Sequence, residues 1–204
     1  EEFYAALEQG QKIMAPALAR HNSSTAPSVG VIGHSHMDTA WLWHIGETIK
    51  KCARTYSNQL NLMEQYPEYK FVQSSAYHSE VLRVHYPELF ERIRQKVLEG
   101  RYEPNGGVWV ECDCNITSGE SMIRQFLWGQ RFTRKYFNYT SDSFWLPDTF
   151  GYSAAIPQIM KGCGVKYFLT TKMAWNDTNQ FPYDTFYWKG IDGTKVFAHL
   201  NKTH

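Results

Sequence analysis

Short apolar segments alternate with helical segments along most of the chain, and this alternation limits the fold more than any other feature. Strands are predicted at residues 29–33, 69–73, 102–110, 143–146 and 165–170, and helices at residues 47–66, 80–85, 87–100, 118–137 and 156–162. Residues 185–189 and 195–200 flank a Gly-Ile-Asp-Gly turn and predict a hairpin. This order favours an α/β fold with a mostly parallel sheet flanked by helices.

The first 28 residues differ from this pattern. Residues 1–20 carry apolar side chains at helical spacing, and residues 21–28 are rich in Asn, Ser, Thr and Pro. We therefore predict an N-terminal helix and linker at residues 1–28, followed by an α/β domain at residues 29–204.

The composition argues against several classes of function. The 204 residues carry a formal net charge of +1, so no nucleic-acid partner is expected. No apolar run approaches 18 residues, so no membrane association is expected either. The four cysteines lack zinc-finger spacing and are expected as free thiols, which favours a cytoplasmic location. In that compartment the five N-x-[ST] sequences are chance matches.

The strongest local signal follows the apolar run at residues 29–33. His34, His36 and Asp38 alternate with other residues, so in an extended backbone their side chains project to the same side. Two imidazoles and one carboxylate suit zinc, and a catalytic zinc typically takes three protein ligands. The alternative is a polar cluster at a strand end that satisfies its own hydrogen bonds.

A second carboxylate, Asp148, follows the predicted strand at residues 143–146. Phe150 and Gly151 come directly after it, as expected where a chain turns sharply beside a ligand. Taken alone, Asp148 is better explained as an ordinary turn or helix-capping residue, which is the commonest use of Asp after a strand.

Together, the two segments resemble the α-mannosidases of glycoside hydrolase family 38. Residues 34–41 (HSHMDTAW) are similar to the family's HxHxD–xxW motif, and residues 148–151 (DTFG) are similar to its D-x-F-G motif. The intervening segments 73–76, 106–111 and 118–121, and the later segment 170–176, look like the bacterial and cytosolic branch. The resemblance covers about residues 30–200, and the ordered set of motifs is far more specific than HxHxD alone.

The resemblance implies a role for each matching residue. His36, Asp38 and Asp148 would be zinc ligands, with Asp148 also the catalytic nucleophile. His34 would orient its neighbours without binding the metal. The aromatic side chains Trp41 and Phe150 would pack against the mannose ring. Three further candidates for the wall of the site, for which a purely structural role is as well supported, are Glu111, Asp113 and Lys172.

The resemblance also implies an activity and a domain. The activity is a retaining exo-α-mannosidase that needs Zn²⁺, or another divalent metal such as Co²⁺, and acts on α-mannoside oligosaccharides. The domain would be part of a seven-stranded, barrel-like α/β catalytic domain. In the family, a fourth ligand (His) and the acid/base Asp lie downstream of D-x-F-G. We therefore expect residues 1–204 to be an incomplete fragment, inactive alone and weak in zinc binding. The resemblance leaves homo-oligomerisation of the full-length protein open.

Two other functions fit parts of the same pattern. A metal-dependent carbohydrate deacetylase also uses His and Asp ligands, but it needs a general base near its metal and would release acetate rather than mannose. A non-catalytic sugar-binding module would keep the aromatics and the metal, and its mannose binding would survive Asp148→Asn.

Overall fold

The computed structural model describes residues 2–201, so residues 202–204 at the end of the predicted α/β domain lie outside the described part. The chain divides into two compact units, one ending at Val31 and the other beginning at Ile32. The first unit contains helix α1 (Glu2–Leu18), whose apolar side chains, such as Ile13 and Leu18, are exposed.

The second unit contains the remaining helices. They are α2 (Ile45–Gln65), α3 (Ala76–His85), α4 (Pro87–Leu98), α5 (Gly119–Phe137), α6 (Ile156–Gly162) and the short 3-10 helix η1 (Lys172–Ala174). The sequence signals explain several of their ends. Pro87 opens α4, and the Ser118 side chain accepts a hydrogen bond from the backbone N–H of Ser121 at the start of α5. Among the described helices, none combines the length and the apolar character that crossing a bilayer would require.

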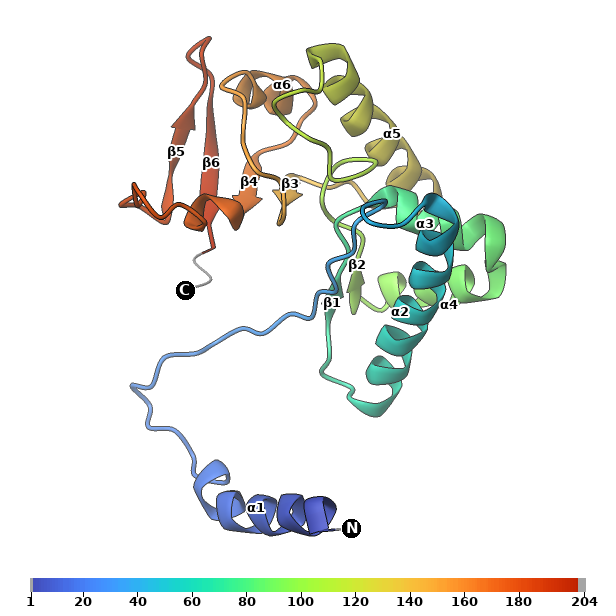
Figure 1. Cartoon of the computed structure of the whole chain (residues 1–204), viewed down its shortest axis with the longest axis vertical. Coiled ribbons are helices and arrows are strands. Elements are labelled where there is room, and N and C mark those ends of the chain that lie inside the picture. The colour runs from blue at the N-terminus through green and yellow to red at the C-terminus, as the bar shows by residue number, and fades with distance from the viewer. Residues whose placement is uncertain (1, 202–204) are drawn as a thin grey trace. The chain divides into compact units, whose positions relative to one another are not determined.

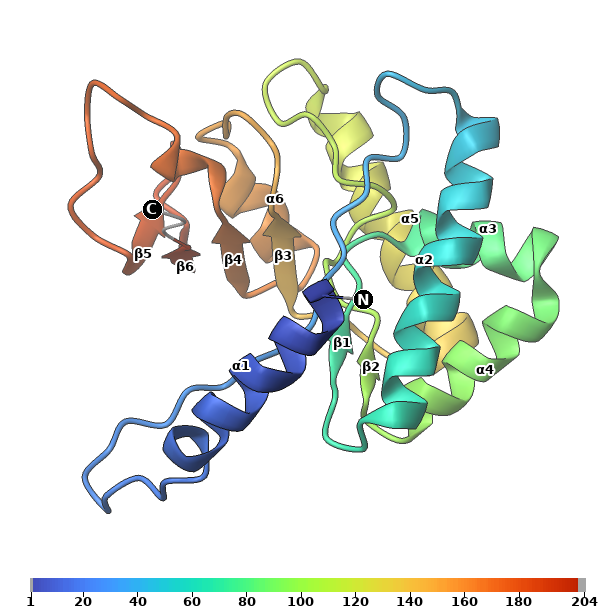
Figure 2. The same ribbon diagram turned by 60° about the horizontal axis from the view of Figure 1, so that its bottom comes forward.

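The strands form two small sheets. Strands β1 (Phe71–Val72) and β2 (Tyr102–Glu103) pair in parallel. The other sheet has the order β3-β4-β6-β5, from strands β3 (Ser143–Leu146), β4 (Tyr167–Thr170), β5 (Thr185–Lys189) and β6 (Lys195–Leu200). The pairs β3–β4 and β4–β6 are parallel, and the β5–β6 hairpin is antiparallel. Figures 1 and 2 show the two sheets, with α2 to α5 beside β1 and β2.

Isolated parallel bridges connect these strands into one series. Gly33 pairs with Phe71 of β1, and Gly106, just after β2, pairs with Phe144 of β3. Gly106 also lies so close to Ser74 that a Cβ at this position would collide with the backbone carbonyl of Ser74, so no other residue fits there. The series therefore runs from Gly33 through β1, β2, β3 and β4 to β6, with all these segments parallel and their carboxyl ends on the same side.

The mixed α/β class predicted from the sequence is confirmed, but several predicted bounds are wrong. The strands predicted at 69–73 and 165–170 are shortened to β1 and β4, and the helix predicted at 80–85 begins at Ala76. Two other predicted strands differ more strongly. Residues 29–32 form no strand: the side chains of Val29 and Val31 are 82% and 85% exposed, and only Gly33 pairs with a neighbour. The strand predicted at 102–110 is limited to β2, because the Gly106-Gly107 pair has positive φ angles and turns the chain.

Two apolar clusters form the core of the second unit. One lies between α2, α3, α4 and the β1–β2 pair, and α2 contributes one face to it. The other lies under β3, β4 and β6 and is covered by α5 and α6. The side chains that α2 buries, at the predicted helical spacing, are Thr48, Cys52, Tyr56, Leu60 and Met63. These clusters fix the strands whose carboxyl ends carry the polar residues described next.

Candidate active site

The structure brings together three of the residues singled out by the sequence. Nε2 of His36 lies 3.2 Å from Oδ2 of Asp148 and 3.6 Å from Oδ1 of Asp38. One ligand atom from each of the three residues lies within 4.8 Å of the other two. All three side chains are about one-third exposed, so the cluster is open to solvent. Such a group of one imidazole and two carboxylates can hold a divalent metal.

The cluster forms because each residue follows the carboxyl end of a parallel segment. His36 and Asp38 follow Gly33, which pairs with β1, and Asp148 lies two residues beyond β3. Two further polar residues also lie just beyond the carboxyl ends of parallel strands: Ser74 follows β1, and Lys172 follows β4. Ligands of open parallel sheets bind at this edge, because loops from successive strands converge there.

Glu111 connects the cluster to a neighbouring loop. Its Oε1 accepts a 2.6 Å hydrogen bond from the hydroxyl of Ser74 and lies 3.5 Å from Nδ1 of His36. The hydrogen bond with Glu111, followed by the nearby charges of Glu111, Asp148 and Asp38, raises the pKa of His36 to about 9 against the effect of burial. The carboxylates of Glu111, Asp148 and Asp38 therefore favour positive charge at this position.

Lys172 supports Asp148 from the other side. Its ammonium pairs with Oδ1 of Asp148, whereas Oδ2 faces His36. The Lys172 side chain is only 7% exposed, and its Nζ lies 3.1 Å from the ring centroid of Trp175 and 4.4 Å from that of Phe150. Each oxygen of the Asp148 carboxylate therefore has its own partner, and this restricts rotation of the carboxylate.

The turn that carries Asp148 is also fixed by hydrogen bonds. The hydroxyl of Tyr152 donates to the carbonyl of Thr149 at 2.6 Å and contacts the hydroxyl of Thr170. Thr170 in turn donates to the carbonyl of Leu146 at 2.7 Å, so β3, its turn and β4 are tied together.

His34 does not join the three convergent ligands. Its Nδ1 lies 2.9 Å from the carbonyl oxygen of Val72, and its ring lies 4.3 Å from that of Trp145. Burial lowers the pKa of His34, which favours the neutral ring. The ring of His36 lies 6.3 Å away, so His34 packs behind the cluster between β1 and β3.

The remaining candidates are placed differently. Trp41 is 67% exposed and contacts Trp43 edge-on, and Phe150 is exposed beside Lys172. The carboxylate of Asp113 accepts hydrogen bonds from the backbone N–H groups of Asn115 and Ile116. Asp113 therefore stabilises its own turn, which agrees with the purely structural role given above as the alternative for this residue.

Sequence reasoning missed a buried histidine behind the first motif. His78 on α3 is almost completely buried, and its ring nitrogens lie 3.0 Å from the hydroxyl of Tyr56 and 3.2 Å from that of Thr39. Thr39 follows Asp38 directly, and its carbonyl accepts a hydrogen bond from Thr48. His78 thereby ties the loop that carries Asp38 to α2 and α3. The burial of a histidine depends on tertiary packing, so no sequence spacing signalled it.

This burial makes stability depend on pH. Desolvation, with smaller contributions from His36 and His34, lowers the pKa of His78 to about 4 from an ordinary value of 6.5. Below pH 6.5, His78 becomes protonated in the unfolded chain but stays neutral in the folded chain. We therefore expect the free energy of unfolding to fall by about 3 kcal/mol between pH 6.5 and pH 4. Urea unfolding of residues 1–204 at several pH values checks this against His78→Gln. Equal pH dependence in the two proteins would contradict it.

The described residues fit a divalent metal. Three ligand atoms of suitable type converge, the cluster carries excess negative charge, and it is open on its solvent side. A nitrogen and two carboxylate oxygens suit Zn²⁺ and also Co²⁺, so the ligand types alone do not select one of them.

Comparison with known proteins shows the family of the chain. The model of the glycosyl hydrolases family 38 N-terminal domain matches residues 26–204. The chain belongs to glycosyl hydrolase family 38. It is 49% identical over 182 residues to alpha-mannosidase G of Dictyostelium discoideum, covering 89% of this chain and 17% of that protein. It is 47% identical over 190 residues to human alpha-mannosidase 2C1, covering 93% of this chain and 18% of that protein.

A solved alpha-mannosidase structure also shares the fold. An alpha-mannosidase from Enterococcus faecalis V583 superposes with a TM-score of 0.69 at 25% identity, over 83% of this chain and 19% of that one. The chain thus spans less than one-fifth of the length of these family 38 relatives. The resemblance drawn from the two motifs is confirmed at the level of the family.

Proposed function

We propose that this chain supplies the metal-binding and nucleophilic part of a retaining exo-α-mannosidase active site. The observation that carries the proposal is the convergence of His36, Asp38 and Asp148, from two distant motifs, in a chain of family 38. The relatives named above are α-mannosidases, which supports terminal α-linked mannose of oligosaccharides as the substrate.

His36, Asp38 and Asp148 would hold the metal, with Zn²⁺ the first choice and Co²⁺ the second. When bound, the metal would act as a template for the mannose 2- and 3-hydroxyls and favour distortion of the ring. Glu111 accepts from Ser74 and lies beside Nδ1 of His36, so it would orient the imidazole with Nε2 toward the metal. The position of His34 behind the cluster supports an orienting role for that residue as well.

Asp148 would attack the anomeric carbon as the bond to the leaving oxygen breaks, giving a covalent glycosyl-enzyme. Lys172 would hold the carboxylate in line and keep it from rotating, because it binds the oxygen that does not face His36. A second carboxylic acid must protonate the leaving oxygen and then activate water. We assign this acid, and a fourth metal ligand, to no residue of this chain.

The other proposals follow from the family. Trp41 and Phe150, both exposed near the ends of the two motifs, would pack against the mannose ring. The parallel series from Gly33 to β6 supports a seven-stranded, barrel-like domain, of which this chain would be a part. We also propose a cytoplasmic location, which the four free cysteines support, because thiols stay reduced in that compartment.

The test uses the protein produced at the full length of its natural reading frame. We expect it to release the aryl group from an aryl α-mannoside, and not from the β-anomer. The same preparation is given an N-acetylated oligosaccharide, and released acetate is measured. Acetate without mannose would replace the proposal by a deacetylase, and mannose binding without either product would replace it by a sugar-binding module.

A further inference from the structure

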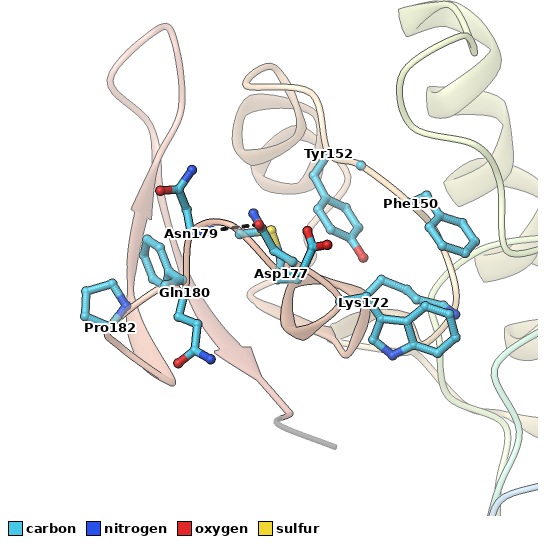
Figure 3. A pocket seen from close by; sticks show the side chains of 12 residues that line it. Phe150, Tyr152, Lys172, Asp177, Asn179, Gln180 and Pro182 are labelled. Carbon is cyan, nitrogen blue, oxygen red and sulfur yellow. Dashed lines mark hydrogen bonds between the residues drawn. The ribbon is translucent and has the colours of Figure 1, made fainter. Parts of the chain in front are cut away.

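A cavity of about 440 Å³ opens beside the nucleophile. Phe150, Tyr152 and Lys172 lie on one side of it, and Gln180 and Pro182 on the other, as Figure 3 shows. The ammonium of Lys172, which lines the cavity, binds Asp148, so a single side chain separates the cavity from the proposed catalytic group. Its volume is typical of small-molecule sites and exceeds what one sugar ring needs.

The far part of the cavity carries polar groups with unused hydrogen-bonding capacity. Among residues 2–201, the one hydrogen bond to the carboxylate of Asp177 comes from the hydroxyl of Thr178, at 3.4 Å. Within the described part of the chain, the side-chain amides of Asn179 and Gln180 make no hydrogen bond. In Figure 3 the Asp177 side chain lies between Tyr152 and the Asn179–Gln180 segment. Carboxylates and amides of this kind are the groups that bind sugar hydroxyls, because they accept two or more hydrogen bonds each.

The aromatic residues supply the apolar half of such a site. Trp175 is 59% exposed and Phe150 is 73% exposed, and their rings meet edge to face at 6.0 Å. The ammonium of Lys172 lies 3.1 Å from the Trp175 ring centroid, which fixes that ring relative to Asp148. An exposed aromatic surface next to free hydrogen-bond acceptors matches a ligand that has both C–H faces and hydroxyl groups.

We propose that this cavity binds a second sugar residue of the substrate, next to the mannose that is cleaved. Asp177 accepts hydrogen bonds from its hydroxyl groups, Gln180 adds a second polar contact, and Trp175 offers its exposed face. The inference rests on the proposed α-mannosidase function. It adds that the enzyme recognises more of the oligosaccharide than the terminal mannose, and that the segment after β4 provides this recognition.

The experiment compares two substrates in the full-length natural protein. An α-linked mannobiose places a second sugar in the cavity, whereas α-mannosyl fluoride has no group to enter it. Loss of a hydrogen bond to a charged partner lowers binding by about 10-fold or more. For Asp177→Ala we therefore expect kcat/KM to fall about 10-fold for at least one of the α-1,2-, α-1,3- and α-1,6-linked mannobioses. The value for α-mannosyl fluoride should stay unchanged.

Two variants complete the test. Gln180→Ala is expected to change kcat/KM in the same direction, by about threefold for loss of a neutral hydrogen bond. Asp142→Asn removes an exposed carboxylate that does not line the cavity and that accepts a hydrogen bond from the hydroxyl of Ser143. It should leave both substrates unaffected. Equal effects of Asp177→Ala on mannobioses and on the fluoride, or no effect on either, would overturn the subsite. Failure to hydrolyse either substrate would instead overturn the proposed function.

Discussion

Asp148→Asn lowers kcat/KM for an aryl α-mannoside by at least about 1000-fold in the full-length natural protein, because an amide cannot form the glycosyl ester. The substitution keeps the size of the side chain and the oxygen that accepts from Lys172. The fold should therefore persist, and circular dichroism and thermal melting should show only small changes. The measurement is steady-state hydrolysis at substrate concentrations well below KM.

Asp142→Asn is the matched control, because it changes an exposed Asp directly before the same strand. We expect it to keep wild-type activity. The account of Asp148 as nucleophile fails if Asp148→Asn loses less than about tenfold while Asp142→Asn behaves as wild type, since removal of a nucleophile costs far more.

His36→Ala is expected to weaken Zn²⁺ binding by more than about 100-fold, because even the loss of a partner that orients a ligand costs about 10- to 100-fold. Nε2 of His36 faces both Asp38 and Asp148, so its loss leaves two carboxylates without their shared nitrogen partner. Zinc affinity is measured by competition with a chromophoric chelator, which does not depend on activity.

His85→Ala serves as the control for this variant, because His85 is an exposed histidine at the end of α3. It should bind Zn²⁺ as tightly as the wild type. If His36→Ala and His85→Ala bound the metal equally well, His36 would not be a ligand, and the convergence at the strand ends would need a different explanation.

Most helices, and the residues at which several of them begin, could be predicted from the sequence, because their signals are local. Apolar spacing along residues 47–66 predicts the buried face of α2, and Pro87 marks the start of α4. The strand that delivers Asp148 has the predicted bounds, since residues 143–146 alternate between buried and partly exposed positions. These features depend on neighbours a few residues apart.

The features that the sequence did not predict depend on contacts between distant segments. The apolar run at residues 29–32 has the composition of a buried strand, yet only Gly33 finds a partner, in β1. Glu111 and Lys172 were open alternatives, and the structure places them beside His36 and Asp148 because two further strands end at that edge. His78 was missed since its burial is decided by Tyr56 and Thr39, 22 and 39 residues away.

The retaining α-mannosidase function is tested most directly by proton NMR of the first sugar released from an aryl α-mannoside by the full-length natural protein. The account predicts that α-mannose appears first and then mutarotates toward the equilibrium mixture, because Asp148 and water each invert the anomeric carbon once. Initial release of β-mannose would show direct attack by water and contradict the nucleophilic role of Asp148. Release of no mannose from a zinc-loaded protein would contradict the proposed activity itself.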